Sequence, residues 1–372
     1  MTSVRVVVVG AGIGGLTAAV ALRSVGAQVE VFEQAAELGE VGAGVALIPS
    51  SLRVLGRLGL EPELSRLAAP VDKLWVRGPE GTILRQQDMG PRGTAGMYRP
   101  DLVEILAAAL PDGVVHSGHR CTGFGQDEHS AHVSFDNGAH ASADLVVAAD
   151  GIHSVLQRHV VQPQPPVFSG RIAYRGVLPA AKIPGWPRYD GCMWNSPGKN
   201  FLTFPVHAGE LRNFVGFLPA DTAMRESWSA PGTPAALAAE FADWDPKLSE
   251  LLAQIETTFR WGLYDHDPLP RWSRGRLTLL GDAAHAMLPH MGQGANQAIE
   301  DAIALATLTR DIPAAGIPEA LTRYEQLRRP RTTLIQQGSR TNGQRLDTGE
   351  RLDTPPPILT DYDIQAEAEA LR

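Results

Sequence analysis

The first 33 residues constrain the fold of this chain more than any other stretch. Residues 4–9 read Val-Arg-Val-Val-Val-Val, which is typical of a central parallel strand buried on both faces. The run continues directly into Gly10-Ala11-Gly12-Ile13-Gly14-Gly15, and apolar residues then recur at helical spacing. A second strand at 28–32 ends at Glu33. A strand, a glycine turn, a helix and a strand in this order predict an α/β fold with a Rossmann-type parallel sheet.

The same stretch predicts a dinucleotide site. Gly10 and Gly12 would give the tight turn and let backbone approach a pyrophosphate, while Gly15 would permit close packing of helix on sheet. Glu33 follows Gly10 at roughly the 20-residue separation expected of the acid that binds ribose hydroxyls. An acid here disfavours a 2′-phosphate. The sequence therefore predicts FAD or NAD, rather than NADP, as the tightly held dinucleotide.

Two later apolar strands also end where an acidic residue adjoins a glycine. These junctions are Asp150-Gly151 and Gly281-Asp282. Ligands of open α/β sheets bind at the carboxyl ends of the strands, so we expect both junctions to face the same crevice as Gly10. After the second junction comes a loop with Pro and Gly residues, and then a helix. Its backbone N–H groups and helix dipole would suit an electron-rich ring edge.

The middle of the chain has a different character. Four segments alternate or carry aromatic residues between turn clusters, which predicts an antiparallel sheet. They are 172–178, 192–194, 201–206 and 214–218. Further predicted elements are a hairpin over 71–84 and helices at 49–58, 99–110, 153–161, 233–241 and 318–340, with one more helix capped by Asp245.

These elements predict a discontinuous chain organisation. A dinucleotide-binding domain comprises 1–165 and 273–310, and an inserted antiparallel β-sheet domain for the substrate comprises 166–272. The hairpin region 71–95 joins the substrate domain. Residues 311–372 form a helical carboxyl-terminal region that ends in a polar tail after about residue 340.

Composition excludes several function classes. The chain has 372 residues and a formal net charge of −8, which argues against nonspecific nucleic-acid binding. Its two cysteines, Cys121 and Cys192, exclude a disulfide framework, and the histidines between 116 and 132 do not have the spacing of a metal site. No apolar run is long enough for a membrane helix. We expect a cytoplasmic protein, monomeric or homodimeric, with no metal, nucleic-acid or membrane partner.

The three junctions, taken together and in this order, resemble those of the single-component (class A) FAD-dependent aromatic hydroxylases. The resemblance spans roughly residues 3–335 and is closest to the branch with salicylate hydroxylase, 3-hydroxybenzoate 6-hydroxylase and 6-hydroxynicotinate 3-monooxygenase. The stretches that carry it are Phe32-Glu33-Gln34, Gly39-Glu40-Val41-Gly42-Ala43-Gly44, Ala149-Asp150-Gly151-Ile152-His153-Ser154, and Leu280-Gly281-Asp282-Ala283-Ala284-His285 through Glu300-Asp301-Ala302.

The resemblance implies a FAD-dependent monooxygenase that uses NADH or NADPH and O2. A flavin C4a-hydroperoxide would hydroxylate a small phenolic or hydroxy-aromatic acid substrate. Noncovalent FAD would be tightly bound, whereas the nicotinamide donor would bind transiently because only one dinucleotide fingerprint is present. The cofactor-binding residues that it implies are Gly10, Gly12, Ile13, Gly14, Gly15, Glu33, Gln34, Gly44, Val45, Arg99, Asp150, Gly151, Gly281, Asp282, Gly292, Gly294, Ala295 and Asn296.

On the substrate side, His290 is the residue that we expect nearest to the reacting phenol, with Pro289 beside it. An imidazole with an ordinary pKa near roughly 6.5 would take the phenolic proton near neutral pH. Aromatic and sulfur side chains of the predicted sheet are candidates for the pocket lining. These candidates are Tyr174, Met193, Phe201 and Phe204.

The sequence alone leaves other functions open. A flavin-dependent epoxidase or reductase acting on a non-aromatic alkene would use the same fold, and a FAD-binding redox sensor without catalysis would also fit. A flavin-dependent halogenase is disfavoured because residues 183–186 read Ile-Pro-Gly-Trp and do not match Trp-x-Trp-x-Ile-Pro. Ala46 stands where the hydroxynicotinate enzyme has a histidine, which argues against transferring that substrate.

Overall fold

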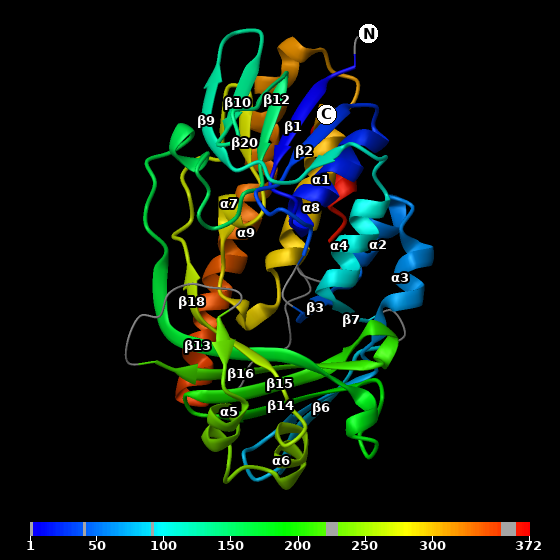
Figure 1. Ribbon diagram of the computed structural model, residues 1–372, viewed down its shortest axis with the longest axis vertical. Coiled ribbons are helices and arrows are strands. Elements are labelled where there is room, and N and C mark those ends of the chain that lie inside the picture. Colours follow the sequence, from blue (N-terminus) through cyan, green and yellow to red (C-terminus); the bar gives the residue numbers. More distant parts are fainter. Residues whose placement is uncertain (1–2, 40–41, 91–92, 221–229, 351–361) are drawn as a thin grey trace.

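Two sheets organise the molecule, one above the other in Figure 1. The computed structural model describes residues 3–39, 42–90, 93–220, 230–350 and 362–372. In the upper sheet the strand order is β19-β20-β12-β1-β2-β8, and all pairs are parallel except β19 with β20. Its strands are β1 (Arg5–Val9), β2 (Gln28–Phe32), β8 (Val115–His116), β12 (Leu145–Ala148), β19 (Ser273–Arg274) and β20 (Leu277–Leu279).

The centre of this upper sheet is buried on both faces, as the β-branched run predicts. Residues 6–9 of β1 and all four residues of β12 are buried. Small residues let the neighbouring helices approach, since a Cβ on Gly14 of α1 (Ile13–Ser24) would come within 3.1 Å of Ala298 in α8 (Gly294–Thr309). The other helices around this sheet are α2 (Pro49–Arg57), α3 (Glu61–Leu67), α4 (Arg99–Ala108), α7 (Asp282–His285) and α10 (Ile364–Glu369).

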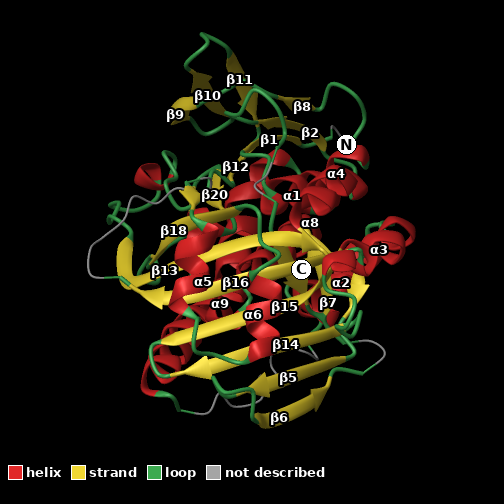
Figure 2. Cartoon of the chain, turned by 60° about the horizontal axis from the view of Figure 1, so that its bottom comes forward, coloured by secondary structure: helices red, strands yellow, loops and turns green. Residues whose placement is uncertain are grey.

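The lower sheet has eight strands in the order β17-β18-β13-β16-β15-β14-β5-β6 (Figure 2). All its pairs are antiparallel except β14 with β5, so the early hairpin β5–β6 adds to a sheet otherwise built from later residues. Its strands are β5 (Lys73–Arg77), β6 (Ile83–Asp88), β13 (Val167–Pro179), β14 (Asp190–Ser196), β15 (Lys199–Val206), β16 (Leu211–Pro219), β17 (Pro231–Gly232) and β18 (Thr258–Asp265).

Helices cover one face of the lower sheet. The cover consists of α5 (Pro234–Glu240) and α6 (Pro246–Leu252), and the Asp245 side chain caps α6 by accepting a hydrogen bond from the Lys247 N–H at 3.0 Å. An aromatic core lies between these helices and the sheet. The opposite face of the sheet is turned toward the upper part of the molecule, where the long helix α9 (Ile317–Thr348) spans both parts (Figure 1).

Two small sheets complete the described fold. One has the order β3-β7-β4, and the other has the order β11-β10-β9. Their strands are β3 (Gly44–Leu47), β4 (Ala69–Pro70), β7 (Ala95–Tyr98), β9 (Cys121–Gln126), β10 (Ala131–Phe135) and β11 (His140–Ala143). Short 3-10 turns occur at η1 (Gln157–His159), η2 (Ala180–Lys182), η3 (His207–Gly209), η4 (Pro289–Met291) and η5 (Ala314–Gly316).

The predicted α/β fold with an antiparallel sheet and a helical carboxyl-terminal region is confirmed, but two local predictions are wrong. The helix expected over 153–161 is only the three-residue turn η1, because Asp150 Oδ2 accepts from the Val155 N–H at 2.9 Å and holds the preceding residues in turns. The polar tail expected after about residue 340 is helical to Thr348. The domain boundaries stay a prediction.

Neither a membrane-spanning helix nor a cluster of potential metal ligands occurs among the described residues. Cys121 and Cys192 are both buried free thiols.

Candidate active site

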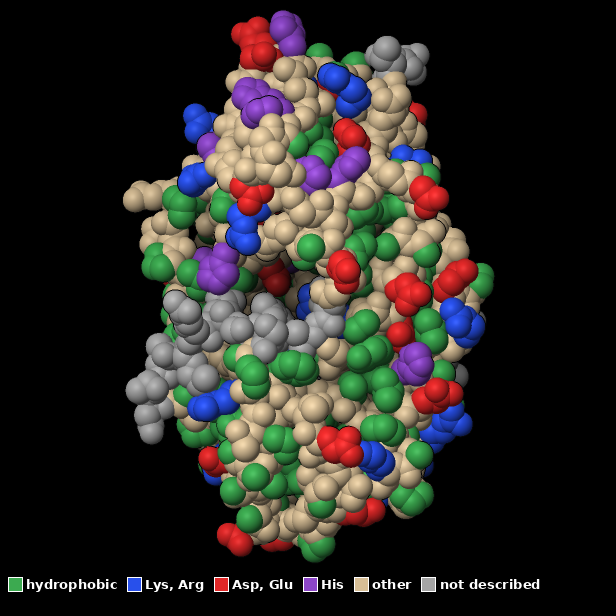
Figure 3. Space-filling view, in the orientation of Figure 1, with side chains coloured by type: hydrophobic (Ala, Val, Ile, Leu, Met, Phe, Trp, Pro, Cys, Tyr) green, Lys and Arg blue, Asp and Glu red, His purple; other side chains and the backbone are tan. Residues whose placement is uncertain are grey.

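A large cavity lies between the two sheets, and Figure 3 shows the surface hollowed there. Its volume is about 1770 Å³. Pockets for small molecules usually occupy about 300–1,000 Å³, so this cavity has room for a dinucleotide and a further ring. Its walls come from the glycine turn after β1, the junction after β20, the loop before α8, the uncovered face of the lower sheet and the end of α9.

The fingerprint glycines divide into two roles. Gly10 has φ +103°, and a Cβ there would overlap the Ala149 backbone; a Cβ on Gly15 would overlap the Gly10 carbonyl oxygen. These two positions therefore need glycine for packing. A Cβ on Gly12 would meet no protein atom within 4 Å, and Gly12 lines the cavity as the N-cap of α1. Open space against a helix amino terminus fits a pyrophosphate.

Glu33 lies at the same turn, as predicted. Its carboxylate accepts hydrogen bonds from the N–H groups of Ala11 at 2.7 Å and Ala35 at 2.8 Å. These bonds hold the acid beside the fingerprint, although Glu33 is not among the residues that line the cavity, and its role toward ribose hydroxyls stays a prediction. Gln34 follows it as an exposed residue.

Charged side chains from three distant segments meet in the cavity. Arg99, the first residue of α4, and Asp282, the first residue of α7, both line the wall. Burial lowers the pKa of Arg99, and the attraction of Asp282 opposes that change. Arg175 of β13 also lines the cavity, and burial together with repulsion from Arg99 lowers its pKa well below the ordinary value. This electrostatic arrangement would stabilise a bound anion.

A buried network holds the turn that presents Asp282. Gly281 has φ +62°, and its N–H donates to Asp301 Oδ2 at 3.1 Å. The same carboxylate contacts His285 Nε2 at 2.5 Å and accepts from Arg328 Nε at 2.7 Å. Asp301 is fully buried, and His285 and Arg328 keep its pKa low against the effect of burial. The turn therefore has a fixed conformation in which Asp282 faces the cavity.

The Asp150-Gly151 junction reaches the same place only in part. Gly151 and the following Ile152 line the cavity. The Asp150 carboxylate accepts from the Val155 N–H instead, and burial raises its pKa. Its predicted role at the cofactor stays a prediction.

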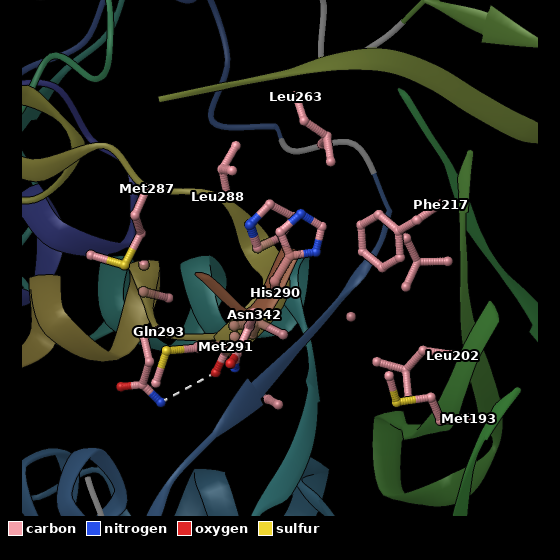
Figure 4. Close-up of a pocket in the computed structure, with 18 of the residues that line it drawn as sticks. Met193, Leu202, Phe217, Leu263, Met287, Leu288, His290, Met291, Gln293 and Asn342 are labelled. Carbon is pink, nitrogen blue, oxygen red and sulfur yellow. Dashed lines mark hydrogen bonds between the residues drawn. The ribbon is translucent and has the colours of Figure 1, made fainter. Parts of the chain in front are cut away.

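The loop from Met287 to Gly294 lines the cavity, and Figure 4 shows His290 of this loop opposite Phe217 of the lower sheet. Gly292 has the left-handed φ of +63°, and Gly294 begins α8, so backbone N–H groups at this helix amino terminus face the cavity. The Asn296 side chain is buried behind the loop. It accepts from the Ile48 N–H at 3.1 Å and donates to the Gly292 carbonyl at 2.8 Å, so it positions the loop.

Comparison with known proteins identifies this arrangement. A family model described as FAD binding domain matches residues 3–339. The chain belongs to this FAD-binding family.

Similar proteins place the chain among the FAD-dependent aromatic hydroxylases. It is 38% identical to 3-amino-4-hydroxybenzoate 2-monooxygenase of Streptomyces platensis over 91% of this chain and 87% of that one. It is 33% identical to 6-hydroxynicotinate 3-monooxygenase of Bordetella bronchiseptica over 98% and 96%. Klebsiella pneumoniae HpxO, solved with FAD and uric acid, superposes with a TM-score of 0.84 at 28% identity, covering 99% and 92%. The predicted family and the predicted FAD cofactor are confirmed.

In this cavity, the lower sheet forms the wall opposite the residues that are predicted to hold the cofactor. Of the four predicted lining residues, Met193 and Phe204 line the cavity. The prediction is wrong for Tyr174 and Phe201, which lie in the aromatic core under α5 and α6.

Cross-strand register explains the difference. Met193 is paired with Leu202, and Trp194 is paired with Phe201. Successive residues of a strand point to opposite faces, so these two pairs must face opposite sides of the sheet. Tyr174 and Phe201 are both paired with Gly216 from its two flanking strands, so they share the helix-covered face.

Several cavity residues were not anticipated from sequence. Val215 and Phe217 come from β16, Trp261 and Leu263 come from β18, and Arg175 stacks its guanidinium 3.8 Å from the Trp261 ring centroid. The alternation of apolar residues in β18 could have predicted that strand. The contribution of α9 had no local signal, because all its cavity-lining residues except Leu346 are polar or glycine.

His290 lies in the cavity with its ring 5.4 Å from that of Phe217 (Figure 4). Burial, and then the nearby Arg171, lower its pKa to about 4. The expectation of an ordinary pKa is therefore wrong. Neither ring nitrogen has a hydrogen-bond partner among the described residues, although both are buried, and Nε2 lies toward Gly343 of α9.

Proposed function

We propose that this chain is a NAD(P)H-dependent monooxygenase that hydroxylates a small phenolic or hydroxy-aromatic acid substrate. The observation that carries the proposal is the continuity of one cavity from Gly12 through the Pro289–Gly294 loop to the apolar face of the lower sheet. The relatives named above are aromatic monooxygenases, and their activities support the same reaction class.

The cofactor half of the cavity suits FAD. Gly12 would leave space for the pyrophosphate, Glu33 would accept adenosine ribose hydroxyls, and Asp282 would accept ribityl hydroxyls. The helix amino terminus at Gly294 would face the electron-rich edge of the ring system. When bound, FAD would accept a hydride from NAD(P)H and supply an activated oxygen.

The chain itself would orient the second ring and exclude water. Met193, Phe204, Val215 and Phe217 offer an apolar surface on which an aromatic ring can pack. Such a surface keeps water away from reactive groups and strengthens the remaining polar contacts. The nicotinamide donor would bind transiently, because the sequence contains one dinucleotide fingerprint.

His290 is the proposed contact to the phenol. With a pKa of about 4 it is neutral throughout the neutral range, so it would accept a hydrogen bond from the hydroxyl. It would not act as a base that titrates near pH 7. Pro289 fixes the backbone before it and so places the ring. We place the reaction in the cytoplasm, where buried thiols such as Cys121 stay reduced.

Product analysis tests the proposal. The purified protein, reconstituted with FAD, is incubated with NADH or NADPH, O2 and a panel of phenols and hydroxybenzoates. We expect at least one compound to accelerate NAD(P)H oxidation with formation of a hydroxylated product. The matched control is Phe217→Asp, which would place a charge on the apolar wall and abolish that coupling. A product that is reduced or epoxidised instead would overturn the proposal.

A further inference from the structure

One end of the cavity holds a cluster of buried polar atoms that the reaction described above does not use. The hairpin joining β14 to β15 places Asn195 directly opposite Asn200. Both residues line the cavity, and Asn200 is only 1% exposed. Among the described residues, Asn200 Oδ1, Asn200 Nδ2 and Asn195 Oδ1 have no hydrogen-bond partner.

The cluster adjoins the substrate wall. Asn200 is paired with Phe217 on the next strand, so the two side chains share the cavity face of the sheet. Phe217 is also the ring that His290 contacts. The two asparagines and the imidazole therefore surround the edge of the space where an aromatic ring packs on Phe217.

Leaving these atoms buried without hydrogen-bond partners costs folding free energy. A buried amide without a partner costs about 1–3 kcal/mol, and most buried polar groups in proteins are paired. The hairpin turn itself does not need them: Arg171 donates to the Gly198 carbonyl at 2.9 Å and forms an ion pair with Asp347 of α9. The unpartnered side-chain atoms of the two asparagines therefore take no part in holding the turn.

The hydrogen-bonding groups of the two asparagines suit an uncharged edge of a ligand. Arg171, the arginine that contacts this hairpin, is already paired with Asp347, so it offers no free counter-charge to a carboxylate bound here. An asparagine side chain presents one acceptor and two donors in one plane. Its complement is an adjacent donor and acceptor, as in an aromatic carboxamide or a ring lactam.

We propose that Asn195 and Asn200 are specificity residues that bind an uncharged amide-type edge of the aromatic substrate. This deepens the proposed function and rests on it. The amide group would exchange a pair of hydrogen bonds with Asn200, Asn195 would accept a further N–H, and the ring would lie on Phe217.

Binding to the oxidised, FAD-loaded enzyme tests this assignment without any turnover. The probes are 2-, 3- and 4-hydroxybenzamide, each compared with the hydroxybenzoate of the same geometry, and the signal is the change in flavin absorbance. We expect at least one amide to bind more tightly than its acid. Asn200→Leu, which has similar shape and no polar atoms, should lower that amide-to-acid preference about tenfold.

Two further variants test whether the amide preference depends on the Asn200 side chain itself. Asn200→Asp should also lose the preference, because a carboxylate cannot donate. Lys199→Met should keep it, because Lys199 is the adjacent strand residue and its ammonium pairs instead with Glu240 of α5 at 2.6 Å. FAD affinity should stay unchanged in all three.

Thermal stability supplies an independent readout. Because Leu removes two unpartnered polar atoms, Asn200→Leu should raise the melting temperature of the ligand-free holoenzyme while it lowers amide affinity. A structural asparagine would give the opposite sign. Failure of the wild type to bind any amide, or an unchanged amide-to-acid ratio in Asn200→Leu, would overturn the inference. Absence of hydroxylation with this binding preference intact would instead count against the proposed function alone.

Discussion

The two halves of the cavity are built by different physical means. On the upper side, the residues proposed to contact a ligand lie at strand ends, where a local turn places each one: Gly12 after β1, Asp282 after β20. On the lower side, the proposed contact residues lie in the middle of strands, where pairing with distant strands decides which face a residue occupies. Local turns keep their geometry through backbone constraints, while a sheet face keeps its geometry through register.

The largest expected effect separates packing from ligand binding within the fingerprint. Gly15→Ala should prevent folding of the FAD-binding sheet, because its Cβ would overlap the Gly10 carbonyl, a clash with backbone that nothing can relieve. Gly12→Ala should fold with an unchanged melting temperature without FAD, yet bind FAD at least tenfold more weakly. Expression yield, thermal melting and FAD titration measure the pair. Equal behaviour of the two variants would contradict the division.

On the lower sheet the corresponding contrast is between neighbours on opposite faces. Phe201→Ala should destabilise the protein by about 3–5 kcal/mol, because the ring is fully buried in the core under α5. Phe204→Ala, on the cavity face, should raise the substrate Michaelis constant or increase peroxide release with a smaller loss of stability. Denaturant unfolding and coupled turnover assays distinguish them. A reversed pattern would mean that the cavity face is misassigned.

Removing the carboxylate at the Gly281–Asp282 turn should have an effect of intermediate size on FAD binding. Asp282→Ala is expected to weaken FAD binding by about 1.5–3 kcal/mol, the range for hydrogen bonds to charged groups. Asp301→Asn provides the comparison, because it disturbs the Gly281 turn from behind and should lower both FAD affinity and melting temperature. FAD dissociation constants and melting curves check both. If Asp282→Ala lowered only the melting temperature, its acid would be a helix cap.

A smaller effect concerns the acid sensitivity of the folded protein. The pKa of His290 is lowered to about 4, so between there and its unfolded value near roughly 6.5 the unfolded chain binds more protons and stability rises with pH. From roughly pH 8 to pH 6 the wild type should lose about 1 kcal/mol of unfolding free energy that His290→Gln keeps. Denaturant unfolding at both pH values measures this. Identical losses would mean that the imidazole titrates normally.

The activity of the same His290→Gln variant sharpens the assignment. Turnover should fall by roughly tenfold, the effect of losing one hydrogen bond to the phenol. Because a group with a pKa near 4 does not titrate in the neutral range, the loss should be constant from roughly pH 6 to 9. A loss that shrinks as pH rises would restore His290 as a general base.

The structure around the predicted cofactor-binding residues could be inferred from the sequence because the patterns that predict it are local. A glycine pattern, a strand end and an acid lie within one short segment, and the physics that links them needs no distant partner. The secondary structure around Gly12 and Asp282 agrees with the sequence prediction to within a few residues. Arg175 escaped notice because nothing beside it along the chain distinguishes it from a solvated arginine.

Only some of the lower-sheet residues that line the cavity could be predicted from the sequence. The period of two shows that Met193 and Trp194 face opposite ways, but a choice of cavity or core needs the register with Leu202 or Phe201. That register is a long-range property. The end of α9 was missed for a related reason: its cavity-lining residues include Gly338, Thr341 and Asn342, so no apolar stripe marks the helix there.

Helix α9 has a mechanical consequence. Its 32 residues extend about 48 Å, and Pro330 interrupts the backbone hydrogen bonding within it. On either side of Pro330, Arg328 and Arg331 are fixed to Glu300 of α8. Farther along, Arg340 is fixed to Asp265 of β18, and a Cβ on Gly343 would press on His290.

Helix α9 is thus held by α8 near Pro330, and its carboxyl-terminal tip lies at the β14–β15 hairpin. The arm from Pro330 to Thr348 is about 27 Å long, so a tilt of about 5° moves the tip by about 2 Å. Because Arg328 of α9 belongs to the Asp301 network that sets the Gly281 turn, one helix connects the two ends of the cavity. A tilt of α9 would therefore displace the wall at both ends.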